Sequence, residues 1–491
     1  MSNPRLALAN HMNFFHAGRT VLGGTPRRLS RLGKPTQDLM LRLRHGGPNG
    51  VLLRTQSELS IAQVLINRGL AHPLPPDPEL DFKPDPDLTA DTTDVEIVIP
   101  TRDRVAQVER LLASLDRPGV VVVDDASDRG EELAAVVQRH RGRLVRHSVN
   151  TGPAGARNTG IRNTQAPFIA FLDSDCVASP DWPTAILFHF EDPRVAMVAS
   201  RVLHRGTTPT PDAIIDRLID DYETCHGALD AGPDPGTVGP TSSILSVPSA
   251  AIVLRRSAVE HLTFNEDLRI GEDLDLIWRL CASGWVIRHE PRTTVEHESM
   301  IHFTDWIHRR YEYGTFAGPV DKRHPGNVKL TMEWWSLTMA ALFVAGHPAL
   351  AASVGASRLA HRWWSIRSVP DAAAIAATIT GQEISQEWQD LSLTLRSAWW
   401  PVGATVALGS AISPAARRAS VIVLAPLLWE LITHRPRSSA LTHTLLGALR
   451  EAATGTGVAV SLARSRRFGT FLPRVRHPTF TTVFSRWSQS R

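Results

Sequence analysis

The amino-acid sequence predicts an α/β protein whose central sheet is covered by helices on both faces. Short, continuously apolar segments alternate with helical patterns between residues 95 and 172, which is typical of parallel strands buried on both sides. A stretch rich in proline and acidic residues precedes this region, and the chain becomes helix-rich from residue 328. We therefore predict four parts, at residues 1–74, 75–93, 94–327 and 328–491.

Strands and helices follow one another regularly in the predicted α/β part. Strands are predicted at residues 95–99, 120–123, 144–147 and 168–172, where aliphatic side chains predominate. Helices are predicted between them, at residues 106–115, 131–139 and 153–163. Polar residues at the carboxyl ends of such strands line the crevice in which open α/β sheets bind ligands.

The N-terminal part of the sequence, residues 1–74, is predicted to form a small separate unit. Residues 20–26 predict a strand and a turn, and residues 35–44 and 57–68 predict two helices, the second closed by Gly69. This content suits a winged-helix-like module. The prolines and acidic residues that follow predict an extended linker at residues 75–93.

The C-terminal part combines apolar stretches with arginine. The apolar stretches lie at residues 337–354, 398–412 and 421–432, and none is a clean run of about 20 apolar residues. These stretches are predicted to form interfacial, re-entrant or core helices. A membrane span through the first stretch is the remaining alternative. Residues 413–491 hold twelve arginines, no lysine and two acidic residues, whereas the whole chain has a net charge of +4. This pattern predicts peripheral contact with an anionic membrane, or else a solvated helical face.

Composition excludes other classes of protein. The 43% hydrophobic and 21% charged residues are ordinary for a globular chain, so disorder is not expected. Basic residues are not interleaved with aromatic ones on one face, and nucleic acid is not expected as a partner. The three cysteines show no metal or redox spacing, and the N-terminus shows no secretory pattern. We expect a cytoplasmic protein at the inner face of the cell membrane.

Two aspartates directly follow the last apolar strand, in the sequence FLDSD at residues 171–175. The carboxylates of Asp173 and Asp175 are spaced to bind one hard divalent cation, Mn²⁺ or Mg²⁺, which would neutralise a diphosphate leaving group. Turn formation is the alternative role for such a pair. His297, in the sequence VEHE at residues 295–298, is a candidate third ligand, or else a solvent-facing or core histidine.

Further polar residues mark the predicted ligand crevice. The sequence VIPTRDR ends the first strand with Pro100 and Thr101, and VVVDDAS ends the second with Asp124 and Asp125. Helix capping by an aspartate, including Asp128, is the alternative for the second group. The sequence NTGPAGARNTG, residues 150–160, predicts small residues at a helix start with Arg157 one turn in, which favours a bound anion.

An acidic pair enters a later amphipathic helix, in the sequence GEDLDLIWRL at residues 271–280. Glu272 and Asp273 could complement the helix dipole. Alternatively, one of these two carboxylates could act as a general base that removes the proton of an acceptor hydroxyl during group transfer.

The ordered set of these motifs resembles the family 2 glycosyltransferases of the GT-A fold, a Rossmann-like, doubly wound mixed sheet. The resemblance covers roughly residues 94–320. It implies contacts of Thr101 and Asp125 with the nucleotide and a place for Arg157 close to it. It implies that Asp173 binds ribose and metal, that Asp175 is the direct metal ligand, that Asp273 is the catalytic base and that Glu272 contacts the acceptor. It also implies a single displacement that inverts the anomeric centre.

The outer segments resemble one group within this family. Residues 21–32 and 66–73 are similar to the N-terminal region of mycofactocin-system glycosyltransferases, which is itself similar to the peptide-chaperone domain of peptide-derived cofactor pathways. Residues 309–315 and 322–325 also resemble that group. The resemblance implies UDP-glucose as donor, premycofactocin as the small peptide-derived acceptor, and a β-1,4-linked glucose chain as product.

Two other functions fit parts of the sequence. The apolar, arginine-rich C-terminal part would also suit a membrane-associated family 2 transferase that acts on a polyprenyl-linked or cell-wall glycan. A catalytically silent protein that binds a peptide through its N-terminal module is the second alternative.

Overall fold

The computed structural model describes residues 4–75, 94–206, 214–299, 301–328, 331–434, 439–476 and 484–485. The chain forms two compact units, which are described separately. Unit 1 comprises residues 1–206, 227–299 and 483–491, and unit 2 comprises residues 207–226 and 300–482. Apart from Pro75, the predicted linker lies outside the described residues. The division at residues 327 and 328 stays a prediction.

Unit 1 is built on a nine-stranded sheet with the order β11-β15-β12-β14-β10-β7-β8-β9, in which β13 also pairs with β15. The strands are β7 Val95–Thr101, β8 Val120–Asp124, β9 Arg143–Arg146, β10 Phe168–Leu172, β11 Cys176–Val177, β12 Val195–Arg205, β13 Gly236–Val238, β14 Ala251–Arg255 and β15 Val286–Glu298. The strands β10, β7, β8 and β9 are parallel, as the sequence predicts. The other half of the sheet is mixed, because β14 runs antiparallel to both β10 and β12.

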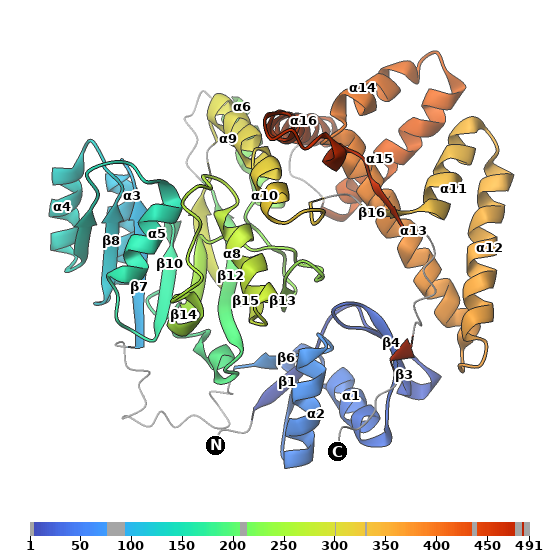
Figure 1. Ribbon diagram of the computed structural model, residues 1–491, viewed down its shortest axis with the longest axis horizontal. Coiled ribbons are helices and arrows are strands. Elements are labelled where there is room, and N and C mark those ends of the chain that lie inside the picture. Colours follow the sequence, from blue (N-terminus) through green and yellow to red (C-terminus); the bar gives the residue numbers. More distant parts are fainter. Residues whose placement is uncertain are drawn as a thin grey trace. The chain divides into compact units, whose positions relative to one another are not determined.

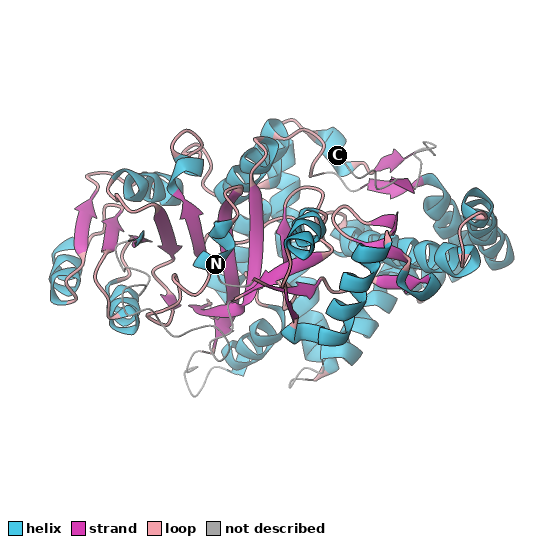
Figure 2. Cartoon of the chain, turned by 90° about the horizontal axis from the view of Figure 1, so that it is seen from below, coloured by secondary structure: helices cyan, strands magenta, loops and turns pink. Residues whose placement is uncertain are grey.

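Helices enclose this sheet because each presents one apolar face to it. They are α3 Val105–Leu115, α4 Gly130–Arg139, α5 Gly152–Arg162, α7 Arg256–Val259 and α8 Glu272–Ala282. On α3 the buried side chains recur at helical spacing, from Val105 and Val108 to Leu111, Leu112 and Leu115. Figure 2 shows helices on both sides of the strands. The result is the α/β architecture of the GT-A fold.

The N-terminal part of unit 1 is a small module with two helices and two short sheets. Its elements are β1 Arg5–Leu8, β2 Asn13–Phe15, β3 Thr20–Gly23, β4 Arg28–Arg31, α1 Lys34–Gly46, β5 Val51–Leu52, α2 Gln56–Asn67 and β6 Ala71–Leu74. The sheets have the orders β5-β1-β6 and β18-β4-β3-β2, where β18 is Phe484–Ser485. A capping box between Thr55 and Glu58 starts α2. Figure 1 shows α1 and α2, in blue, beside β1 and β6. The winged-helix-like character of the N-terminal module stays a prediction.

Unit 2 is helical. It contains α6 Ile214–His226, α9 Phe303–Gly314, α10 Ala317–Arg323, β16 Thr331–Glu333, α11 Trp334–Ala345, α12 Pro348–Ile366, α13 Ala372–Arg396, α14 Trp400–Gly409, α15 Pro414–His434, α16 Ala440–Arg464 and β17 Arg474–Arg476. Close approach of α9 and α16 requires glycine, since a Cβ at Gly457 would collide with the backbone at Tyr311. Within the described part of the chain, the helices are all too short or too polar to cross a bilayer.

Candidate active site

Three potential metal ligands meet at one edge of the nine-stranded sheet. Asp173 and Asp175 follow β10, and β11 then pairs with β15 so that Cys176 lies opposite His297. One ligand atom from each of Asp173, Asp175 and His297 lies within 4.8 Å of the others. His297 Nε2 is 3.2 Å from Asp175 Oδ1, and Arg104 also contacts the Asp175 carboxylate. Two carboxylates and an imidazole suit a divalent cation such as Mn²⁺, so these residues fit the predicted metal.

Arg157 joins this cluster to the acidic pair. Its side chain is 4% exposed, and its Nη2 and Nη1 atoms each donate a hydrogen bond of 2.8 Å, to Asp173 Oδ1 and Glu272 Oε1 respectively. Burial alone would raise the pKa of Asp173, but the charges of Arg157, His297 and Arg104, together with the hydrogen bond from Arg157, outweigh it jointly, and the pKa is lowered. The guanidinium therefore holds two carboxylates from different elements at a fixed separation.

The acidic pair lies in the first turn of α8. Gly271 precedes it in the left-handed conformation, with φ of 84°, which lets the chain turn sharply into the helix. Burial, followed by the charge of Asp273, raises the pKa of Glu272 to about 7. Burial also raises the pKa of Asp273. Two neighbouring carboxyls with raised pKa values near a metal-ligand cluster are suited to proton transfer close to neutral pH.

Asp125 anchors the start of α5. Its carboxylate accepts hydrogen bonds from the backbone N–H groups of Thr151 and Gly152, both at 2.8 Å, and from the Thr151 hydroxyl at 2.9 Å. His147 Nδ1 lies 2.8 Å away. Burial would raise the pKa of Asp125, but these hydrogen bonds lower it. The aspartate thus serves the N-terminus of α5, which follows α4 and β9 along the chain, and its contact with a nucleotide stays a prediction.

Pro100 and Thr101 lie at the end of β7, at the same edge of the sheet. Thr101 is 4% exposed, and its hydroxyl has no hydrogen-bond partner among the described residues. A buried hydroxyl without a partner is costly unless a ligand supplies one. The contact of Thr101 with a nucleotide stays a prediction.

The glycine-rich start of α5 has a packing function as well. A Cβ at Gly160 would collide with the Val98 side chain, and one at Gly155 would collide with Thr151. Gly160 therefore lets α5 lie directly against β7, whereas a Cβ at Gly152 would meet only Arg269 Nη1, at 4.0 Å. Close approach of a nucleotide to this loop stays a prediction.

Two residues of this site are missing from the candidates that the sequence identifies. Arg104 lies within the motif VIPTRDR and contacts Asp175. His147 follows β9 and lies within hydrogen-bond distance of Asp125 and of Thr159 Oγ1. The rule that polar residues at strand ends form the site would have selected His147, because β9 is the strand next to β8.

Replacing Asp175 by alanine is expected to weaken metal-dependent donor binding at least about tenfold, since one anionic oxygen ligand is lost. Calorimetric titration of UDP-glucose with and without Mn²⁺ measures this effect. Asp181→Ala, a change in the nearby loop outside the cluster, serves as control. Equal donor affinity in the Asp175 variant and the parent protein, with metal present, would contradict the metal assignment.

Comparison with known proteins identifies the family of the chain. The family model "Glycosyl transferase family 2" matches residues 96–245. The pre-mycofactocin glycosyltransferase of Mycobacterium tuberculosis is 30% identical over 498 residues, which cover 94% of this chain and 95% of that protein. The succinoglycan biosynthesis protein ExoU of Rhizobium meliloti is 32% identical over 213 residues, 39% of this chain and 58% of that protein.

A solved structure of the mannosyltransferase PcManGT from Pyrobaculum calidifontis, in complex with GDP-Man and Mn²⁺, is 17% identical with a TM-score of 0.36. The similarity covers 70% of this chain and 87% of that one. The full-length similarity to the mycobacterial transferase, together with the family match over the strands that carry the site, places the chain among the family 2 glycosyltransferases.

Proposed function

We propose that this protein transfers glucose from UDP-glucose to premycofactocin and builds a β-1,4-linked oligosaccharide with inversion at the anomeric carbon. The similarity of 94% of this chain to the mycobacterial pre-mycofactocin glycosyltransferase supports premycofactocin as the acceptor. The observation that supports this reaction is that Arg157 contacts both Asp173 and Glu272, each at 2.8 Å. These contacts link the first turn of α8, which carries the candidate base Asp273 next to Glu272, to Asp173 of the candidate metal site.

In this proposal the residues have distinct tasks. Asp273 accepts the proton of the acceptor hydroxyl, Glu272 orients the acceptor, and Thr101 and Asp125 contact the nucleotide. A divalent cation bound by Asp173, Asp175 and His297 would neutralise charge on the departing diphosphate. Inversion in one displacement requires no covalent nucleophile from the chain.

The acidic limb of the pH–rate profile is expected well above the ordinary aspartate pKa of about 4. A base must be ionised to act, and both carboxyls of the pair have raised pKa values, that of Glu272 being about 7. Activity should therefore fall with decreasing pH well before the pH reaches about 4, measured as kcat/KM between about pH 4 and pH 9. Glu272→Gln removes a neighbouring negative charge and should move the limb to lower pH. A parent limb below about pH 5 would contradict the assignment.

The test of the proposed function is transfer with purified components. The protein is incubated with UDP-glucose, Mn²⁺ and premycofactocin, and products are identified by mass spectrometry. Hexose added stepwise to the acceptor, with linkage analysis giving the β-1,4 bond, supports the proposal. Hydrolysis of UDP-glucose without modification of premycofactocin would support UDP-glucose as the donor and contradict premycofactocin as the acceptor. Absence of both donor hydrolysis and transfer overturns the proposed reaction.

We also infer that unit 2 binds an anionic bilayer peripherally. Residues 398–416 contain no charged side chain and are followed by Arg417 and Arg418. Around the turn between α14 and α15, Leu408 is 81% and Ile412 is 88% exposed. Apolar tips flanked by arginine suit the boundary between acyl chains and anionic headgroups.

The double variant Leu408→Ser/Ile412→Ser is expected to bind anionic vesicles at least about tenfold more weakly, since burying each aliphatic side chain stabilises by about 1.5–3 kcal/mol. Co-sedimentation with vesicles of phosphatidylglycerol and phosphatidylcholine measures the effect. Val149→Ser, at an exposed apolar residue of unit 1, is the matched control. A parent protein that stays in the supernatant would contradict the inference.

A further inference from the structure

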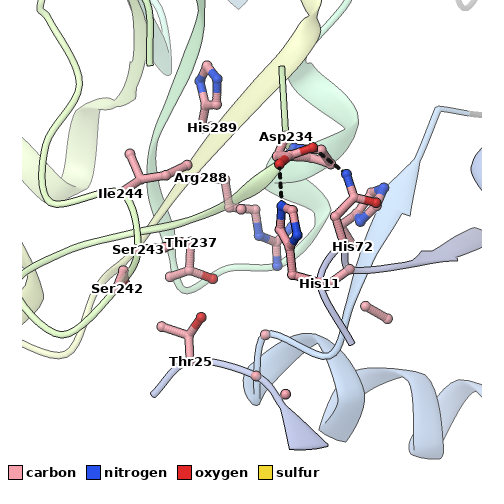
Figure 3. A pocket seen from close by; sticks show the side chains of 18 of the residues that line it. His11, Thr25, His72, Asp234, Thr237, Ser242, Ser243, Ile244, Arg288 and His289 are labelled. Carbon is pink, nitrogen blue, oxygen red and sulfur yellow. Dashed lines mark hydrogen bonds and ion pairs between the residues drawn. The ribbon is translucent and has the colours of Figure 1, made fainter. Parts of the chain in front are cut away.

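A cavity of about 570 Å³ lies within unit 1, between the N-terminal module and the nine-stranded sheet (Figure 3). The module contributes the turn from Gly23 to Arg27 and part of β6, including His72. The sheet side contributes Thr237 of β13, the loop from Thr241 to Ile244, and Arg288 and His289 of β15. A volume of this size is typical of small-ligand sites.

Direct contacts hold the two walls of the cavity together. Asp234 accepts a hydrogen bond from Asn10 and lies 3.0 Å from His11 Nε2. Arg194 Nη2 donates to Asn67 Oδ1 at 2.6 Å, and Arg292 Nη2 donates to the Pro73 carbonyl at 3.2 Å. These contacts connect both ends of the module wall to the sheet side, so the cavity is a built feature of unit 1.

Most charged groups around the cavity are paired with an opposite charge in the protein, and Arg27 Nη2 donates to the amide oxygen of Asn13 at 2.7 Å. The Arg288 guanidinium is 3.1 Å from Asp192, and Asp234 is paired with His11. Glu290 lies 2.9 Å from His189 and also contacts Arg292. An ionic ligand would have to compete with these pairs, so the walls favour an uncharged one.

Polar groups that lack partners remain in the walls. His289 is 1% exposed, and its Nε2 donates to the Gly232 carbonyl at 3.0 Å, which leaves Nδ1 as a buried acceptor without a partner among the described residues. His72 Nδ1 is likewise buried without a partner, and burial lowers the pKa of His72 to about 4, so the ring is neutral at pH 7. Both nitrogens are buried behind the cavity surface, so they add polar character to the walls.

Hydroxyl side chains complete the lining. Thr25 belongs to the module, and Thr237, Ser242 and Ser243 belong to the sheet side. In Figure 3, Thr25 and Thr237 approach the cavity from its two walls. Hydroxyls both donate and accept hydrogen bonds, which matches a ligand that carries many hydroxyl groups.

We propose that this cavity binds an uncharged saccharide, namely the part of the glycan acceptor that lies away from the reacting end. The assignment rests on the proposed glycosyl transfer. Ile244 in the cavity wall is six residues from Ala250, whose carbonyl accepts a hydrogen bond of 3.1 Å from Asp173 N–H. That stretch spans at most about 20 Å, so a glycan in the cavity is within reach of the metal-ligand cluster.

The experiment uses the full chain and a cello-oligosaccharide as probe, with binding followed by ligand-observed NMR. Ser243→Trp places a bulky side chain in the cavity wall and is expected to weaken probe binding at least about tenfold. Thr237→Val removes one hydroxyl and should weaken it less. Ser60→Trp, at an exposed serine of α2 outside the cavity, should bind like the parent protein.

Product length separates failure of this site from failure of the proposed function. In the transfer assay, Ser243→Trp is expected to attach the first glucose normally and to give shorter chains. Unchanged chain lengths together with unchanged probe binding would overturn the saccharide site and leave the transfer reaction intact. Probe binding that Ser243→Trp abolishes, in a protein that transfers no sugar, would retain the site and overturn the proposed function.

Discussion

Replacing Asp273 by asparagine is expected to lower kcat for sugar transfer by about 10²–10⁴-fold, the usual contribution of a general base. Asparagine keeps the shape of the side chain and an oxygen that can accept the 2.7 Å hydrogen bond from Leu274 N–H. Donor binding should therefore be unchanged, because only proton acceptance from the acceptor is lost. Single-turnover assays and calorimetric titration of UDP-glucose measure the two properties separately.

Asp267→Asn provides the matched control for this change. Asp267 is an exposed carboxylate in the loop before α8, outside the arginine-linked cluster. Its substitution should leave both turnover and donor binding at the parental level. A fully active Asp273→Asn enzyme would eliminate Asp273 as the base, and equal loss of donor binding would point to a structural role instead.

Replacing Arg157 by methionine is expected to destabilise unit 1 by about 3–5 kcal/mol at pH 8, because it leaves buried carboxylates without their counter-charge. Asp173 and Glu272 would lose their shared cation. The folded-state pKa of Glu272 is already raised to about 7. A carboxyl with a raised pKa contributes stability that is lost as the pH rises through that value. The loss should therefore be larger at pH 8 than at pH 6, where protonation relieves it.

Thermal unfolding at both pH values measures this effect. Arg139→Met removes a largely exposed arginine that pairs with Glu109 on the surface, and it should cost about 0–1 kcal/mol at either pH. Arg157→Lys retains the charge but cannot make both hydrogen bonds in the same geometry. Its loss of stability should therefore lie between those of Arg157→Met and Arg139→Met. A pH-independent loss in Arg157→Met would indicate that packing, rather than charge, dominates.

The sequence predicts the parallel half of the sheet well because the signal there is local. Each of β7, β8 and β10 is a short run of aliphatic residues buried by helices on both faces, and the pattern alone identifies it. By contrast, β15 alternates apolar with charged and histidine side chains over Val286–Glu298, and its partners β12, β11 and β13 come from distant segments. Strand order in this half depends on long-range pairing that periodicity does not encode.

The same distinction applies to the site. The positions of Asp173, Asp175 and the acidic pair of α8 follow from strand ends and a helix start, which are local features. The ion pairs of Arg157 do not follow from local features, because its partner Glu272 lies 115 residues further along the chain. Asp125 similarly acts on α5 rather than on the helix that directly follows it. A buried ion network is determined by the tertiary fold, so local motifs give its members but not its connections.

One strand, β15, runs from the cavity to the metal-ligand cluster. It carries His289 in the cavity wall and His297 beside Asp175, eight residues apart, a path of at most about 26 Å along the strand. β15 pairs with β12 at both His289 and His297, with a register shift between them. If the cavity holds the acceptor glycan as proposed, a growing product would reach it only after bridging that distance. Initiation and elongation would then depend on different residues of the same enzyme.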